Sequence, residues 1–172
     1  MIKQIQNAIA LCLSNYFPRI GFFNRIRWKI LKAGGAGIEN SHIWAPIDIR
    51  PFGCLKNIKI GRGTFVNTGF RCGVPNGVIV EIGENCAIGP RVSIETVNHN
   101  LSWSEKEKWG VKKKSVKVGD RVWIGSGVIV LPGVNIGSDS VIAAGAVVTK
   151  SFPERSIIAG VPARLIRRNE VD

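Results

Sequence analysis

The chain of 172 residues contains only two histidines, and none of its four cysteines stands in a C-x-x-C pair. Zinc clusters and three-histidine catalytic metals need more ligands at closer spacing, so we expect no bound metal. The cysteines are expected to be free thiols in a reducing compartment. They are Cys12, Cys54, Cys72 and Cys86.

Long hydrophobic runs are also missing. The longest run near the N-terminus, Ala8 to Leu13, is too short for a membrane-spanning helix. No basic start followed by a small-residue cleavage site indicates a signal peptide. The chain is 45% hydrophobic, which is too apolar for disorder, and its length suits one domain with a sizeable core. We expect a cytoplasmic protein.

Acidic residues are absent from residues 1–33, which carry six Lys or Arg. The rest of the net charge of +12 comes from residues 105–117 and 150–172. Charge alone drives non-specific nucleic-acid binding, but no recognition motif accompanies it, so we expect no nucleic-acid partner. Binding of nucleic acid through the lysine-rich segment 105–117 is the alternative, and a steep salt dependence would reveal it.

Aliphatic residues recur every six positions in the second half of the chain, at Val118, Ile124, Val130, Ile136, Ile142 and Val148. A small or aliphatic residue precedes each by two positions: Val116, Val122, Val128, Val134, Ser140 and Ala146. A helix repeats at three and four residues and a simple strand alternates, so a period of six fits neither. It fits a short strand and a turn, repeated, with both marked residues on the inner face. Stacked coils of three such units bury a continuous core, which predicts a parallel β-helix.

The period stops after Ile94 and resumes at Val116. The intervening segment is polar and basic, so we expect it to be extruded as a loop over residues 95–115. Loops on a rigid scaffold are where binding and catalytic groups collect. His99 lies in this loop. Histidine titrates near neutral pH and can accept a proton from an attacking hydroxyl.

The hexads have a recognisable form, VGDRVWIGSGVIVLPGVNIGSDSVIAAGAVVTKSFPERSIIAGVPARLIRR, which ends at Arg168. This segment resembles the hexapeptide-repeat acyltransferases, and most closely the branch of galactoside, maltose and polysaccharide O-acetyltransferases. The resemblance covers residues 58–168. It implies a left-handed β-helix, contrary to the usual right-handed crossover. It also implies a homotrimer with acetyl-CoA in the groove between neighbouring prisms.

The expected fold is therefore all-β, with a left-handed parallel β-helix of hexapeptide repeats over residues 34–168. Residues 1–33 are expected to form a mainly helical arm. A short C-terminal helix and a tail over residues 169–172 complete the expected organisation.

The resemblance also implies catalytic residues. It gives His99 the role of general base toward the acceptor hydroxyl, and Asn67 the positioning of acceptor or intermediate, where developing negative charge needs a donor. We further expect Glu95 to orient His99 by a hydrogen bond. The alternatives are that His99 is a surface residue without a role and that Asn67 only supports a left-handed turn.

Donor-binding residues follow from the same resemblance. Small residues are expected along the pantetheine arm and Trp123 at the border of the thioester channel. Cations are expected at the phosphates and adenine, because Arg offers paired donors and Lys a point charge. The set comprises Trp123, Ser126, Ala144, Gly145, Thr149, Lys150, Arg164 and Arg167. Alternatively, Trp123 packs on the prism face and the cations are merely solvated. Cys86 occupies an inward position, so we expect an inert thiol and direct transfer.

The N-terminal arm mixes aromatic and aliphatic residues with cations. Such a segment suits an element that lies on an anionic membrane surface. The alternative, which we favour, is a cap on the open end of the coil stack, which repeat proteins need.

The sequence thus predicts an acetyl-CoA-dependent O-acetyltransferase acting on a sugar hydroxyl in surface polysaccharide or lipopolysaccharide synthesis. The alternatives are an amino-sugar N-acetyltransferase, a serine acetyltransferase, and a non-catalytic β-helical binding scaffold. A pure scaffold has no need of the phosphate-binding set around Lys150 and Arg164.

Overall fold

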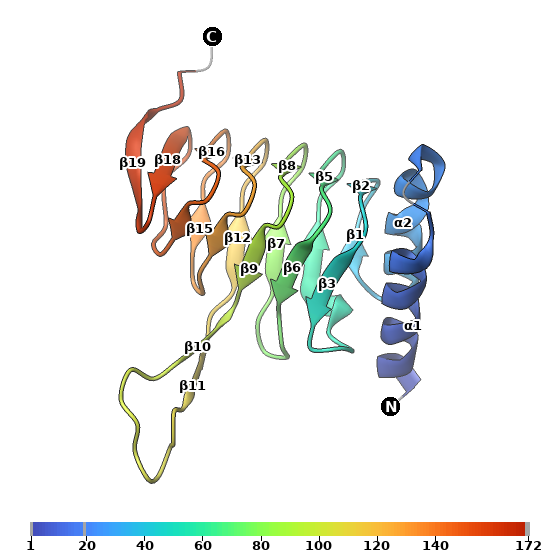
Figure 1. Cartoon of the computed structure of the whole chain (residues 1–172), viewed down its shortest axis with the longest axis horizontal. Coiled ribbons are helices and arrows are strands. Elements are labelled where there is room, and N and C mark those ends of the chain that lie inside the picture. The colour runs from blue at the N-terminus through green and yellow to red at the C-terminus, as the bar shows by residue number, and fades with distance from the viewer. Residues whose placement is uncertain (1, 19, 171–172) are drawn as a thin grey trace.

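A computed structural model describes residues 2–18 and 20–170 (Figure 1). Met1, Arg19 and the last two residues of the expected tail, 171–172, lie outside the described residues. Two helices, α1 (Ile2–Tyr16) and α2 (Gly21–Ala33), lie at the N-terminal end of a stack of coils. The stack is a three-sided prism of short strands, with one sheet on each side.

Each of five coils gives one strand to each sheet, and sheet B has two further strands at its C-terminal end. Sheet A contains β1 (Gly37–Ile38), β4 (Ile58–Ile60), β7 (Val80–Ile82), β12 (Val116–Val118) and β15 (Asn135–Ile136). Sheet B contains β2 (His42–Ile43), β5 (Phe65–Val66), β8 (Ala87–Ile88), β13 (Trp123–Ile124), β16 (Val141–Ile142), β18 (Ser156–Gly160) and β19 (Ala163–Arg168). Sheet C contains β3 (Ile47–Arg50), β6 (Phe70–Gly73), β9 (Ser93–Glu95), β14 (Ile129–Val130) and β17 (Val147–Val148). One 3-10 turn, η1 (Leu55–Asn57), precedes β4.

The six-residue period sets the register between coils. In sheet B, Ile88, Ile124 and Ile142 pair in parallel and are fully buried. The residues two positions before the marked aliphatics are buried as well, including Ser140. The inward-facing pair predicted for each hexad is therefore confirmed, and the fold is a left-handed parallel β-helix of about five turns.

The corner between sheets A and B shows why glycine recurs in the hexads. A Cβ added at Gly83 would lie 2.6 Å from the carbonyl oxygen of Gly119 in the next coil. Only glycine allows the coils to stack this closely at that corner.

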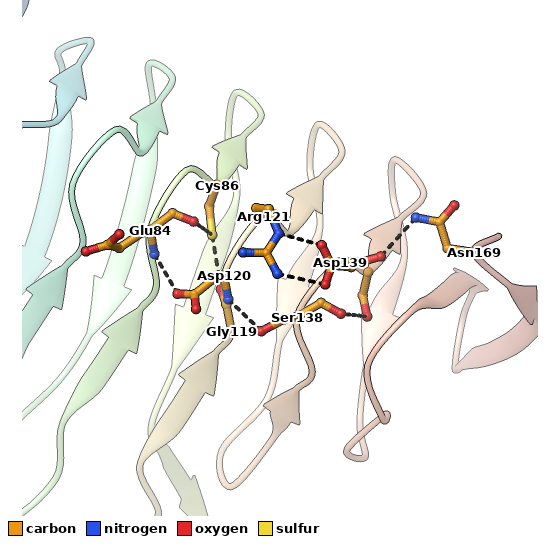
Figure 2. A network of polar contacts seen from close by, with 9 residues as sticks. Glu84, Cys86, Gly119, Asp120, Arg121, Ser138, Asp139 and Asn169 are labelled. Carbon is orange, nitrogen blue, oxygen red and sulfur yellow. Dashed lines mark hydrogen bonds and ion pairs between the residues drawn. The ribbon is translucent and has the colours of Figure 1, made fainter. Parts of the chain in front are cut away.

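Polar side chains tie the same corner together from coil to coil, as Figure 2 shows. The Asp120 carboxylate accepts a hydrogen bond from the Glu84 N–H at 2.9 Å, and the Asp120 N–H donates to Ser138 Oγ at 3.0 Å. Arg121 and Asp139 form a two-point ion pair at 2.6 and 2.9 Å. The Arg121 guanidinium lowers the pKa of the Asp139 carboxyl by hydrogen bonding to its charged form.

The segment that interrupts the period forms a hairpin of β10 (Val97–His99) and β11 (Val111–Lys113), paired antiparallel. It leaves the prism after β9 in sheet C and returns at β12 in sheet A. Figure 1 shows it projecting away from the prism, so the extruded loop is as expected.

The C-terminal segment corrects one expectation. It is not a helix, because β19 folds back antiparallel on β18. Gly160, with φ of +100°, makes the reversal at a conformation that glycine adopts readily. The pairing satisfies the edge of β18, which a helix would have left open.

The two helices cap the other end of the prism. Leu31 of α2 is fully buried, and Leu11 of α1 joins the core under the first coil. The Asn15 side chain exchanges two hydrogen bonds with the backbone of Ile47, at 2.8 and 3.0 Å. The amide thus replaces the neighbouring strand that the first coil lacks.

Candidate active site

His99 is the last residue of β10 and its side chain is exposed. Its Nδ1 atom lies 2.9 Å from the carbonyl oxygen of Gly110 on the opposite side of the hairpin. A carbonyl oxygen only accepts hydrogen bonds, so Nδ1 carries the proton in this contact. The neutral ring therefore has its lone pair on Nε2, which is the arrangement that a proton acceptor needs.

Glu95 does not orient His99. Its Oε1 atom accepts a hydrogen bond from Ser93 Oγ at 3.0 Å and lies 3.6 Å from Arg71 Nε. Glu95 ends β9 on the prism, whereas the ring of His99 is held by the hairpin itself. The orienting role that we expected of Glu95 thus falls to the Gly110 carbonyl.

A cavity of about 600 Å³ lies on the outer side of sheet B and reaches the corner toward sheet C. Four of the residues expected from the sequence line it: Asn67, Trp123, Ser126 and Ala144. They come from three coils, since Asn67 follows β5, Trp123 lies in β13 with Ser126 just after it, and Ala144 follows β16. The fold also places Pro90, after β8, between them.

Small residues leave backbone exposed in this cavity. Gly125 cannot carry a Cβ, because that atom would lie 2.5 Å from the Ala144 nitrogen. Within residues 2–18 and 20–170, the backbone N–H groups of Ser126 and Ala144 have no hydrogen-bond acceptor. The Gly145 N–H is already used, because it donates to the Ser126 carbonyl at 2.8 Å, and Gly145 does not line the cavity. Two free donors on one side of an apolar groove suit a ligand with amide carbonyls.

The Asn67 side chain has a local partner. Its Oδ1 accepts a hydrogen bond from the Thr68 N–H at 2.8 Å. This contact uses the amide oxygen and leaves the Nδ2 group to donate into the cavity, which Asn67 lines.

The expected phosphate-binding residues lie outside the lining of this cavity, Arg164 and Arg167 at the far end of sheet B. Thr149 and Lys150 follow β17 at the corner toward sheet A, and both are exposed. The Lys150 ammonium lies 5.8 Å from the Phe152 ring centroid. Arg164 and Arg167 are exposed on β19 and donate to nearby backbone carbonyls. The four residues therefore do not join the cavity on sheet B.

Within the single chain, His99 also lies apart from that cavity. The hairpin leaves the prism between sheets C and A (Figure 1), whereas the residues that line the cavity belong to sheet B and its corner toward sheet C. His99 and the residues that line the cavity thus lie on different sides of the prism.

A second cavity of about 530 Å³ lies at the base of the hairpin, and sequence reasoning missed it. Its lining includes Val97 and Val111 of the hairpin, together with Arg50, Arg71 and Glu95 of sheet C. The Arg50 guanidinium stacks 4.2 Å from the Phe52 ring centroid. No periodic signal exists in this part of the sequence, because the cavity is made where the period breaks.

Cys86 is suited to packing and not to nucleophilic attack. It is buried, and its thiol donates to the Gly119 carbonyl at 3.1 Å. Burial raises the pKa of the Cys86 thiol. Within the described residues, no three His, Cys, Asp or Glu side chains are grouped to hold a metal ion.

Comparisons with known proteins indicate one family of transferases. Residues 115–150 match the family model described as bacterial transferase hexapeptide (six repeats). A galactoside O-acetyltransferase of Escherichia coli (strain K12) is 36% identical over 129 residues, which are 75% of this chain and 61% of that protein. The matched stretch spans between 54 and 61% of the length of such curated relatives.

Solved structures resemble a larger part of the chain. A galactoside acetyltransferase in complex with coenzyme A is 31% identical, with a TM-score of 0.82, over 98% of this chain and 82% of that one. A hexapeptide-repeat-containing acetyltransferase of Vibrio cholerae complexed with acetyl coenzyme A is 28% identical, with a TM-score of 0.82, over 99 and 88% of the two chains. The chain belongs to the hexapeptide-repeat acyltransferase family, in the branch that contains the galactoside O-acetyltransferases.

Proposed function

We propose that this protein is an acetyl-CoA-dependent O-acetyltransferase that acts on a sugar hydroxyl in surface polysaccharide or lipopolysaccharide synthesis. The observation that carries the proposal is the ring of His99, whose Nδ1–H is held by Gly110 so that Nε2 is free to take a proton. The cavity on sheet B, and the relatives that bind coenzyme A or acetyl coenzyme A, support acetyl-CoA as the acetyl donor.

The chemical groups of acetyl-CoA, the proposed acetyl donor, match those that line the cavity. The pantetheine arm is a narrow chain with two amide groups, and the free N–H groups of Ser126 and Ala144 can donate to their carbonyls. Trp123 is 58% exposed beside them and offers an apolar wall for the thioester end. Thr149, Lys150, Arg164 and Arg167 would hold the phosphates and adenine from positions outside the cavity.

The reaction is a direct transfer. Nε2 of His99 accepts the proton of the acceptor hydroxyl while its oxygen attacks the thioester carbonyl. Asn67 Nδ2 can donate to the oxygen on which negative charge develops. The C–S bond then breaks, and the imidazolium returns the proton to the departing thiolate, which yields an O-acetyl sugar and free coenzyme A.

Assembly completes the site. Because His99 and the cavity on sheet B lie on different sides of one prism, we propose a homotrimer in which the hairpin of one protomer reaches the cavity of its neighbour. The cavity at the hairpin base would receive the acceptor. Arg50, Arg71 and Lys113 line it with Glu95, and Asp48 pairs with Arg50 at 2.7 Å. The positive charge that remains favours a sugar that carries a carboxylate or phosphate.

A transfer assay with neutral and anionic sugars tests this function. His99→Ala should lower the acetyl transfer rate by about 10²- to 10⁴-fold, the usual contribution of a general base. The matched control is His42→Ala, which removes the other histidine from an exposed position on β2 and should transfer at the wild-type rate. Full activity of a folded His99→Ala protein would contradict the proposed base.

A further inference from the structure

Helix α1 buries Ala10 and Leu11 together with polar residues against the prism and turns an apolar side outward. Asn7 and Ser14 are buried, and Asn15 bonds to the backbone of Ile47. The outward side carries Ile2, Ile5, Ile9, Cys12, Leu13 and Tyr16. Their spacings of three and four residues place them on one face of the helix. The five large side chains of this set are between 46 and 90% exposed, so the face lacks the cover that apolar surface ordinarily has.

The adjoining helix adds positive charge. Arg25, Lys29 and Lys32 are exposed on α2, and the two lysine ammonium groups lie 5.7 and 5.9 Å from the Trp28 ring centroid. Phe22 is 67% exposed on the same outer side. No acidic residue occurs before Glu39 in the sequence, so nothing in either helix offsets these cations.

An apolar groove joins the two helices. It has a volume of about 360 Å³ and is lined by Ile9 and Leu13 of α1 and by Ile30 and Ala33 of α2. The two helices lie side by side at the end of the prism (Figure 1), and the groove that both line joins the apolar face of α1 to α2 and its cations. We call this surface the cap face.

We propose that the cap face binds an anionic lipid bilayer. The side chains of α1 would enter the boundary between headgroups and acyl chains, and the cations of α2 would lie among the negatively charged headgroups. A second copy docked cap to cap is a poor occupant, because two cap faces would bring their cations together without an acid in either cap. The inference uses the cap alone and does not depend on the transfer reaction. Such contact would bring the prism to acceptor sugars carried on lipid.

The chain offers its own reporter for this contact. Cys12 is exposed on the cap face, whereas Cys54, Cys72 and Cys86 are buried. A polarity-sensitive fluorophore attached to Cys12 therefore reads out whether the apolar side of α1 leaves water. The probe is a vesicle of phosphatidylcholine with about 30 mol% phosphatidylglycerol, compared with phosphatidylcholine alone.

The labelled protein should sediment with the anionic vesicles and shift its emission to shorter wavelength, and should do neither with neutral vesicles. Ile5→Ser/Ile9→Ser and Lys29→Gln/Lys32→Gln should each weaken partitioning about tenfold or more, since apolar and electrostatic contributions act together. The matched controls are Leu165→Ser/Ile166→Ser, exposed on β19 at the far end of the prism, and Lys106→Gln/Lys112→Gln in the extruded segment. These controls should bind as the wild type does.

Three results would overturn the proposal. The first is failure of the wild-type protein to bind anionic vesicles. The second is an equal loss of binding in the control variants, which would place the contact elsewhere. The third is a larger assembly in the absence of lipid that dissociates in the Ile5→Ser/Ile9→Ser variant, because a second copy would then be the occupant.

Discussion

At the scale of single residues, the corner ion pair of Arg121 and Asp139 shows how side chains outside the site support the coils. Each belongs to a different coil, and both backbone positions have positive φ, 53° and 61°. Residues other than glycine adopt this conformation at a cost, which specific contacts offset. The pair is one such contact (Figure 2).

The pair predicts a pH dependence. Because hydrogen bonding to Arg121 lowers the pKa of Asp139 in the folded state, its stabilising effect is present above the ordinary aspartate pKa of about 4. The effect is lost as the pH falls through the lowered folded-state pKa. Asp139→Asn should therefore reduce the free energy of unfolding in urea at pH 7, and the gap from wild type should close in acid. A gap that is unchanged or wider in acid would show that the pair acts through something other than charge.

His99 shows how much of a candidate active site can be predicted from the sequence alone. The sequence shows that the residue is a histidine and that it lies where the six-residue repeat is interrupted. The resemblance to the acyltransferase family supplies its expected role. The hydrogen-bond partner is not readable, because Gly110 lies eleven residues away across a hairpin whose pairing has no sequence signal. For the same reason, His99 was the wrong hydrogen-bond partner to expect for Glu95. Glu95 is close to His99 in the sequence, but in the structure its carboxylate accepts a hydrogen bond from Ser93.

At the scale of elements, strands of two or three residues are predictable here only because they repeat. Ile124 is informative because Ile88 and Ile142 occupy the same position in adjacent coils. The C-terminal segment has no such repetition, and its charged, aliphatic pattern fits a helix or a strand. The segment forms a strand because it pairs with the otherwise open edge of β18. That edge exists only in the folded structure and cannot be seen in the sequence.

The cap depends on the Asn15 side chain, which takes the place of a missing strand beside Ile47. Asn15→Ala should leave that donor and acceptor without partners and lower the free energy of unfolding by about 1–3 kcal/mol. Denaturant titration followed by circular dichroism measures this change. Asn40→Ala, an exposed position in the first coil, is the matched control and should have little effect. Equal stability of the two variants would argue that α1 is held by its apolar contacts alone.

At the scale of the whole molecule, the separation of His99 from the cavity on sheet B predicts a shared site. Two inactive proteins, His99→Ala and Asn67→Ala, should regain activity when unfolded and refolded together. One interface in four of a random mixed trimer then combines an intact His99 with an intact Asn67, so about a quarter of wild-type activity is expected. Refolding each variant by itself is the control. Absence of recovery in trimers shown to be mixed would place both residues of a site in one protomer.

Binding of acetyl-CoA tests the proposed function most directly, because it needs no knowledge of the acceptor. Thermal unfolding should shift upward with acetyl-CoA, since a ligand at about a hundred times its dissociation constant stabilises the folded state by about 2.7 kcal/mol. The shift should be lost in Lys150→Ala/Arg164→Ala and kept in Lys56→Ala/Lys59→Ala, which removes two exposed cations from the second coil and the turn before it. No shift in the wild-type protein at millimolar acetyl-CoA would contradict the transferase function and leave a β-helical scaffold in its place.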